Sequence, residues 1–156
     1  MIELGILAVG KLRPFFREAC DEYARRLKRY AMIGEREIRE SRLGGTAEVE
    51  RDEARRLLEK LPPRSRLVAL TRDGSGWSST DLAGRLDRWM QDGRPVTFAI
   101  GGSTGLSADL LEQADHRWSL GPLTLPHELA RVVVYEQLYR GFTILRGEPY
   151  HKGRRA

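Results

Sequence analysis

Cysteine and histidine are scarce in this chain of 156 residues, which has one cysteine, Cys20, and three histidines. A single cysteine cannot form an internal disulfide, and no Cys/His cluster of the kind that binds zinc is present, so we expect no metal. Long apolar runs are also missing, because none approaches the roughly 20 residues that a membrane helix needs. With Glu3 near the start and no basic leader, the N-terminus lacks the pattern of a secretory signal. We therefore expect a cytoplasmic protein without a membrane span.

The composition is that of an ordinary globular protein, with 40% hydrophobic and 31% charged residues. A chain of this length suits one compact domain, and no repeat, low-complexity tract or linker divides it. The most linker-like stretch, 41–46 with Gly44 and Gly45, is short enough to be only a loop. We expect a single domain over residues 1–156.

The net charge is +5, from 27 Lys and Arg against 22 Asp and Glu. An excess this small has meaning only through its placement. Arg25, Arg26, Arg55 and Arg56 stand among acidic residues on helix-like stretches, which is typical of solvated faces. The basic residues at the end of the chain have no acidic neighbours, and they are Lys152, Arg154 and Arg155.

Short apolar runs alternate along the chain with segments of helical spacing. The runs predict strands at 2–9, 66–71, 95–100 and about 116–120, with a weaker one at 33–40. Apolar residues at helical spacing predict helices at 15–27, 49–61, 82–90, 108–114 and 126–145. This alternation favours an α/β fold with a mostly parallel sheet flanked by helices.

The predicted boundaries carry suitable residues. Pro14 fits a first helical turn, Thr46 and Ser107 are candidate N-caps, and Gly93 can end a helix. The pair at 62–63, two prolines, ends another.

Three glycine-containing loops follow predicted strands, at 72–79, 100–106 and 120–125. Ligands of open α/β sheets bind outside the carboxyl ends of the strands, where these loops should meet. The Gly-Gly-x-x-Gly pattern at 101–105 matches neither a phosphate loop nor a dinucleotide fingerprint, so alone it fits a structural turn as well as a binding loop. Together the loops suit an adenosine-like ligand without phosphates.

The last predicted helix carries polar residues among its apolar ones. Arg131 and Arg140 are each as consistent with surface charges as with a function, and Glu136 is as consistent with an acid that pairs along the helix. His127 lies near the positive end of the helix dipole, which disfavours its protonated form, so a capping or orienting role suits it better than that of a base. The segment at 150–152, Tyr-His-Lys, follows helix stop signals and is either a frayed tail or a strap over the pocket.

Four motifs together carry a family resemblance: Ile-Gly-Gly-Ser-Thr-Gly-Leu at 100–106, Leu-Thr-Leu-Pro-His at 123–127, Arg-Val-Val-Val-Tyr-Glu-Gln-Leu-Tyr-Arg at 131–140, and Arg-Gly-Glu-Pro-Tyr-His at 146–151. The chain closely resembles the bacterial ribosomal RNA large subunit methyltransferase H family. Members of that family are 23S rRNA pseudouridine N3-methyltransferases of the SPOUT superfamily. The similarity runs from Leu4 to Lys152, essentially the whole chain.

The resemblance implies a homodimer with a C-terminal trefoil knot that binds S-adenosyl-L-methionine. It places the cofactor contacts at Leu70, Gly102, Leu120, Gly121, Pro122, Leu123, Thr124 and Leu125. It places the catalytic and RNA-facing groups at Arg140, Tyr150 and His151. The acceptor it implies is a pseudouridine in a stem-loop of 23S rRNA, modified on assembled 70S ribosomes.

A mechanism can be stated for these groups as a hypothesis. Arg140 stabilises charge that grows on the ring carbonyl oxygens, His151 accepts the N3 proton, and Tyr150 stacks on the base. The alternatives are a SPOUT enzyme for another RNA base, a non-catalytic ribosome-binding factor, and a nucleotide-dependent hydrolase. The hydrolase is disfavoured, because no phosphate-loop lysine and no metal-binding carboxylate cluster accompany the loop at 101–105.

Overall fold

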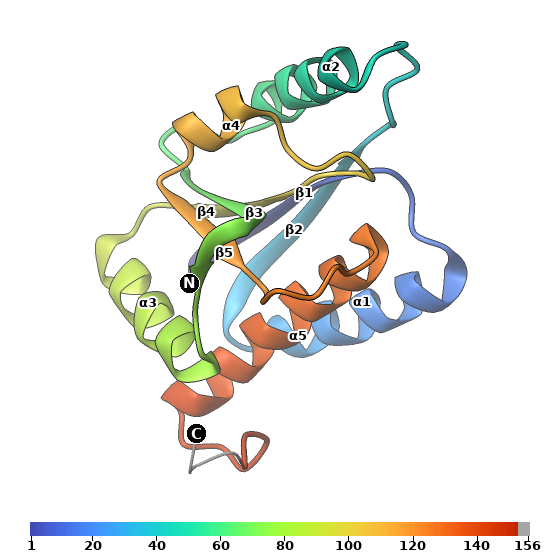
Figure 1. The fold of residues 1–156 in the computed structure, drawn as a ribbon. Helices are drawn as coiled ribbons and strands as arrows, with labels where there is room; N and C mark the ends of the chain where they lie inside the picture. Colours follow the sequence, from blue (N-terminus) through green and yellow to red (C-terminus); the bar gives the residue numbers. More distant parts are fainter. Residues whose placement is uncertain (153–156) are drawn as a thin grey trace.

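A five-stranded parallel sheet forms the centre of the computed structural model, which describes residues 1–152 (Figure 1). The strand order is β2-β1-β4-β3-β5, and every neighbouring pair is parallel. The strands are β1 (Ile2–Val9), β2 (Ala31–Ile38), β3 (Arg66–Gly76), β4 (Val96–Ile100) and β5 (His116–Ser119). The predicted parallel α/β class is confirmed.

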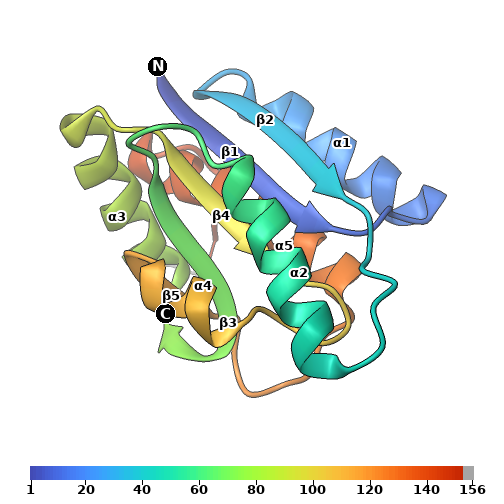
Figure 2. The ribbon, with the colours of Figure 1, turned by 90° about the horizontal axis from the view of Figure 1, so that it is seen from above.

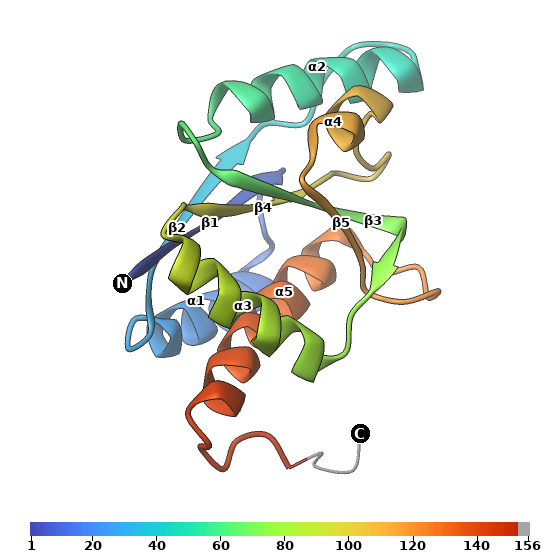
Figure 3. The same ribbon diagram turned by 90° about the vertical axis from the view of Figure 1, so that its left-hand side faces the viewer.

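Helices cover both faces of the sheet, as Figures 2 and 3 show. They are α1 (Pro14–Leu27), α2 (Thr46–Glu59), α3 (Ser79–Asp92), α4 (Ala108–Gln113) and α5 (His127–Leu145). One face packs against α1, α3 and α5, and the other against α2 and the short α4. Side chains alternate along β1, so that Ile6 joins the first core and Leu7 the second. Cys20 is buried in the first core.

The structure corrects three local predictions. β2 begins and ends two residues earlier than the predicted 33–40. The stretch after Thr71, expected to be loop, continues as β3 to Gly76 through an irregularity at which both Leu70 and Ser75 pair with Trp118. Thr46 is not an N-cap, because Gly45 holds that position without a side-chain hydrogen bond.

Other predicted boundaries are confirmed. Pro14 opens α1, and Ser107 accepts a hydrogen bond from the backbone N–H of Leu110 at 3.2 Å. Gly93 ends α3 in the left-handed conformation, with φ of 77°. The basic residues Arg154 and Arg155 lie outside the described residues.

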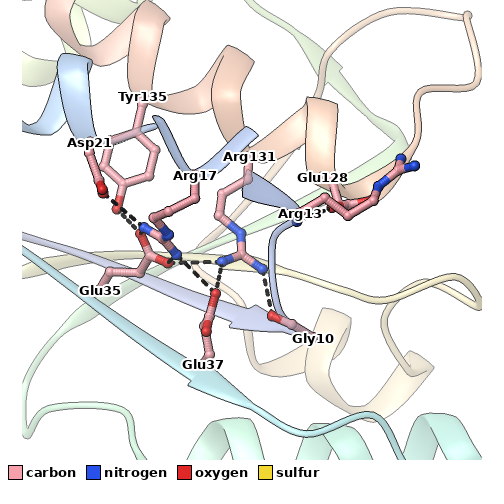
Figure 4. A network of polar contacts seen from close by, with 9 residues as sticks. All are labelled: Gly10, Arg13, Arg17, Asp21, Glu35, Glu37, Glu128, Arg131 and Tyr135. Carbon is pink, nitrogen blue, oxygen red and sulfur yellow. Dashed lines mark hydrogen bonds and ion pairs between the residues drawn. The ribbon is translucent and has the colours of Figure 1, made fainter. Parts of the chain in front are cut away.

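A buried ionic network fixes the start of α5 to the sheet (Figure 4). Arg131 has no exposed surface, so the surface-charge interpretation of this residue is wrong. Its guanidinium donates to the carbonyl of Gly10 at 2.9 Å and to the carboxylates of Glu35 and Glu37 on β2. Because these contacts leave α5 little freedom, they also position the segment 120–125 that leads into it.

A second contact holds the same end of α5 to the β1–α1 loop. Glu128 accepts the backbone N–H of Arg13 at 2.7 Å and its Nε at 3.0 Å. Two ionic contacts therefore fix the first turns of α5.

No helix within residues 1–152 is long and apolar enough to cross a membrane. The same residues contain no group of three or more His, Cys, Asp or Glu side chains placed to hold a metal ion.

Candidate active site

The segments predicted to contact a cofactor meet at the carboxyl edge of the sheet. Leu70 pairs with Trp118 on β5, while the preceding Ala69 pairs with Ala99 on β4. Gly102 comes two residues after β4 ends, and Leu120 comes directly after β5. Because the three strands are parallel neighbours, their ends bring these segments together. Leu70 lies within β3 rather than in a loop after it.

The glycine turn after β4 is tight. A Cβ on the buried Gly101 would lie 2.6 Å from the backbone carbon of Gly105, so only glycine fits. Gly105 has φ of 82°, and its N–H donates to the carbonyl of Gly102 at 3.1 Å. The turn is therefore structural in its own right, and its backbone stays bare enough for a ligand to approach closely.

The segment from Leu120 to Leu125 exposes both apolar and backbone groups. Gly121 has φ of 119°, and its N–H donates to the hydroxyl of Ser119 at 3.1 Å. Leu123 is 74% exposed, which is unusual for a large apolar side chain. This segment thus offers apolar contact without a charged phosphate cradle.

The predicted catalytic residues form a cluster at the opposite end of α5. Glu136 accepts hydrogen bonds from Arg140 Nε at 3.1 Å, Arg140 Nη2 at 2.8 Å and the Tyr150 hydroxyl at 2.7 Å. The Arg140 guanidinium also lies over the Tyr150 ring, 4.7 Å from its centroid. The tail after α5 therefore folds back onto the helix, at least as far as His151.

The contact between Arg140 and His151 determines which nitrogen of the neutral imidazole carries the proton. Arg140 Nη1 lies 3.0 Å from His151 Nδ1, and a guanidinium can only donate. Nδ1 is therefore the acceptor, and the neutral ring carries its proton on Nε2. In this arrangement His151 can donate through Nε2, and it can accept a proton at Nδ1 only after Arg140 moves away.

The surroundings keep Arg140 charged and Tyr150 neutral. Burial lowers the pKa of Arg140, but hydrogen bonding to and the charge of Glu136 outweigh burial and raise it overall. Burial, with hydrogen bonds to Tyr23 and Glu136, raises the pKa of Tyr150 well above its ordinary value. Tyr150 is therefore a phenol at neutral pH and cannot serve as a general base.

Within one chain the two sets of predicted site residues lie far apart. The segment 120–125 precedes the first turn of α5, whereas Arg140 lies 13 residues into the helix (Figure 1). At 1.5 Å per residue, Arg140 lies roughly 20 Å along α5 from His127, the first residue of the helix. A reaction that uses both sets requires a second copy of the chain or a large rearrangement.

One residue of the cluster was not selected from sequence. Glu136 had been considered only as a possible helix-pairing acid, and it does pair with Arg140 at i,i+4 spacing, a signal that can be read from sequence. Tyr23, which contacts Tyr150 from α1, carries no such signal, because its role depends on how α1 packs against α5.

A cavity of about 370 Å³ lies elsewhere, on the face of β1 and β2. It is lined by Gly5, Gly34, Met32, Arg36 and Lys60, among others. None of the predicted site residues lines it.

Comparison with known proteins identifies the family. A family model described as "Predicted SPOUT methyltransferase" matches residues 2–151. A ribosomal RNA large subunit methyltransferase H from Anaeromyxobacter sp. (strain Fw109-5) is 47% identical over 97% of this chain and all of its own length. The corresponding protein of Rubrobacter xylanophilus is 49% identical, over 94% of this chain and 96% of its own. The chain belongs to the ribosomal RNA large subunit methyltransferase H family.

The family assignment makes the chain a methyltransferase of the SPOUT class. A third member, from Chromohalobacter salexigens, is 43% identical over 97% of this chain and all of its own length. A probable methylase family protein from Haemophilus influenzae shares the fold, with a TM-score of 0.58 over 98% of this chain and 72% of its own, at 12% identity. The resemblance seen in the sequence motifs is confirmed.

Proposed function

We propose that this chain transfers a methyl group from S-adenosyl-L-methionine to N3 of a pseudouridine in a stem-loop of 23S rRNA, on assembled 70S ribosomes. The observation that carries the proposal is the cluster of Arg140, Tyr150 and His151 around Glu136, in a member of this methyltransferase family. A guanidinium, a neutral phenol and an imidazole suit an acceptor that is an aromatic ring with carbonyl oxygens and a weakly acidic N–H.

The carboxyl edge of the sheet suits S-adenosyl-L-methionine. Leu70, Leu120 and Leu125 supply half-buried apolar walls, and the bare turn at Gly102 allows close backbone contact with an adenosine group. The cofactor carries no phosphate, and the described residues of this edge have neither a phosphate-loop lysine nor a metal cluster. When bound, it supplies an electrophilic methyl group. The proposed contacts are Leu70, Gly102, Leu120, Gly121, Pro122, Leu123, Thr124 and Leu125.

The active form is a homodimer. The roughly 20 Å of α5 between His127, which follows the segment 120–125, and Arg140 supports this proposal, because a second copy can set the catalytic cluster of one chain beside the cofactor of the other. The segments around Gly102 and 120–125 belong to a C-terminal trefoil knot, the fold that the family resemblance implies. Lys152 and the basic residues after it contact RNA phosphates, an interaction that weakens as salt is raised.

Substrate binding changes the partners of Arg140. As the base enters, the guanidinium turns from His151 Nδ1 toward a ring carbonyl oxygen, where it stabilises the negative charge that develops when N3 loses its proton. The released Nδ1 is then free to accept that proton, directly or through water. Tyr150 stays protonated and stacks on the base. Arg140 thus acts on the substrate and, by leaving His151, makes the base available.

The test uses methyl-labelled S-adenosyl-L-methionine and three acceptors that lack the modification: 70S ribosomes, free large subunits and naked rRNA. Label found mainly in 70S particles, at N3 of a pseudouridine, is the expected result. Label at another base, or in transfer RNA, would replace the proposed substrate. Label in none of them, despite measurable cofactor binding, would contradict the proposed acceptor while leaving the methyltransferase family in place.

The dimer has a separate test. Because each site uses two chains, specific activity should fall when the protein is diluted below its dimer dissociation constant, measured by analytical ultracentrifugation. Constant specific activity in monomer would contradict the shared site.

A further inference from the structure

Glu53 on α2 is a buried carboxylate with one oxygen left unpaired. Its side chain belongs to a residue that is 4% exposed. Oε2 accepts the backbone N–H of Ser41 at 2.8 Å, whereas Oε1 has no hydrogen-bond partner among residues 1–152. A buried acceptor without a donor is costly to the fold, and more so when it is charged. Such a group calls for an explanation beyond the Ser41 contact.

The unpaired oxygen lies beside the turn that is expected to hold the cofactor. A Cβ added to Gly102 would be 3.6 Å from Glu53 Oε1 and 3.0 Å from Val9 Cγ1. Glycine at this position keeps the space between the turn and the carboxylate open. Glu53 lies on α2 and Gly102 in the β4–α4 connection, so the two are far apart in sequence and are brought close by the fold.

The donor that Oε1 lacks is available in the same turn. Ser103 and Thr104 follow Gly102 and are exposed, and in the described structure neither backbone N–H has a hydrogen-bond partner. Because Oε1 itself is closed to solvent, a ligand above the turn cannot reach it directly. The turn itself borders Oε1 at Gly102, so its backbone can supply the donor.

We propose that Glu53 is a positioning residue for the cofactor turn: with the S-adenosyl group bound, Oε1 accepts a backbone N–H from Ser103 or Thr104 and holds the turn in its binding conformation. This inference rests on the proposed function, since it takes the Gly102 turn as part of the cofactor site. Glu53 touches the turn and not the cofactor, so it acts on affinity through the backbone. Oε1, which is not used in the contact with Ser41, is then the oxygen that holds the turn when the cofactor is bound.

A purely structural role makes a different prediction. If Glu53 serves only to anchor the 41–46 segment through Ser41, its loss lowers the stability of the protein and leaves the affinity for cofactor unchanged. Stability and cofactor affinity must therefore be measured on the same variants.

The experiment compares Glu53→Leu and Glu53→Gln with the wild type, using calorimetric titration of S-adenosylmethionine and S-adenosylhomocysteine. Leucine removes both acceptor oxygens, and glutamine offers only one, which serves Ser41 or the turn but not both. Both variants should bind both ligands more weakly by roughly tenfold to a hundredfold, the range expected for one lost hydrogen bond to a charged group. The matched control is Glu59→Gln, on the exposed side of the same helix, which should bind both ligands within twofold of the wild type.

Thermal melting without ligand accompanies each titration. The glutamine variant keeps a polar side chain of the same shape and serves if the leucine variant fails to fold. Unchanged ligand affinity in a folded Glu53 variant overturns the proposal, whatever its melting temperature. A wild type that binds neither ligand contradicts the proposed function itself, so the two failures are distinguishable.

Hydrogen exchange gives an independent readout of the turn. S-adenosylhomocysteine should slow exchange of the amides of Ser103 and Thr104 in the wild type, and this protection should be absent from the Glu53→Leu protein at saturating ligand. Equal protection in the two proteins would overturn the proposal even if their affinities differed.

Discussion

Glu136 positions Arg140 and Tyr150 through three hydrogen bonds. It accepts from two nitrogens of Arg140 and from the Tyr150 hydroxyl, so one carboxylate aims both groups. Glu136→Gln should lower the single-turnover methylation rate by about tenfold or more, because glutamine cannot receive all three donors. Cofactor affinity should stay within twofold of the wild type, since Glu136 is not among the proposed cofactor contacts.

Quench-flow measurement of methyl transfer to 70S ribosomes, paired with calorimetry, separates these two quantities. Glu59→Gln serves again as the control. It removes a carboxylate that pairs with an exposed arginine within α2 and has no part in the cluster on α5. A normal rate in the Glu136 variant would show that Arg140 and Tyr150 are placed by other contacts.

Cys20 gives a second prediction at this scale. Burial raises the pKa of its thiol to about 12, with the nearby charge of Glu35 adding to the effect. The thiolate is the reactive form, so at pH 8 the folded protein should react with a disulfide reagent such as DTNB far more slowly than the same protein in guanidinium chloride. Reaction of the native protein at the rate of a free thiol would mean that this part of the core opens readily.

Single residues also show which side-chain contacts can be inferred from sequence and which cannot. Glu136 and Arg140 are four residues apart on a helix, so their pairing is readable from spacing. Arg131 was not assignable, because its partners Glu35 and Glu37 lie 96 and 94 residues away and meet it only when α5 packs against β2. The roles expected of Arg140, Tyr150 and His151 came from family resemblance, and they remain predictions.

At the scale of elements, periodicity predicted the helices well because each buries one apolar face, and short apolar runs predicted the central strands, which are buried on both faces. The extension of β3 was missed because Gly74 and Gly76 suggest a loop. A Cβ at Gly74 would lie 2.7 Å from the backbone of Arg117, so this glycine lets β3 and β5 approach closely. Local composition indicated a loop, but pairing with β5, which is distant in sequence, extends the strand to Gly76.

The packing of α3 against α5 depends on another glycine. A Cβ on Gly141 would lie 2.7 Å from Cδ1 of Leu86, which is fully buried and has little room to move. Gly141→Ala should lower the free energy of unfolding by about 1 kcal/mol or more, because overpacking outweighs the gain in helix propensity. Urea unfolding followed by circular dichroism measures the change.

Gly84 on α3 provides the matched control. A Cβ there meets only a guanidinium nitrogen of Arg88, at 3.7 Å. Gly84→Ala should therefore raise the free energy of unfolding by about 0.5 to 1 kcal/mol, the ordinary helix-propensity gain. Equal effects of the two substitutions would show that the α3–α5 contact tolerates a methyl group.

For the molecule as a whole, sequence patterns gave the class of fold but not the strand order or the placement of the site. The order β2-β1-β4-β3-β5 results from long-range pairing, for which the chain carries no local signal. The position of Arg140, roughly 20 Å along α5 from His127, likewise shows its consequence only once the helix is placed in the fold. It is the observation behind the proposal that two chains share a site.

The buried network around Glu35 links β2, α1 and α5, and so it couples the whole fold to pH. Burial raises the pKa of Glu35, but hydrogen bonds from Arg17 and Tyr135 and the charge of Arg131 outweigh burial and lower it overall. A carboxyl whose pKa is lowered in the folded state stabilises the fold at pH values above its ordinary pKa of 4.5. This stabilisation is lost as the pH falls through the pKa of the folded state. Glu35→Gln should therefore lose roughly 3 kcal/mol at pH 7, where Arg131 is left short of a partner, and a smaller amount at pH 3.

Urea unfolding from pH 7 to pH 3 tests this, with the wild-type curve falling more steeply than that of the variant. Glu22→Gln is the control, because Glu22 pairs with two arginines at the surface, where solvent screens the pairs, and its loss should change stability little at any pH. Parallel pH curves for wild type and Glu35→Gln would mean that the carboxylate of Glu35 is not what joins the three elements. Arg17 on α1 and Arg131 on α5 would then have to hold their helices against the sheet through Glu37 and Gly10, and removal of Glu37 would become the decisive change.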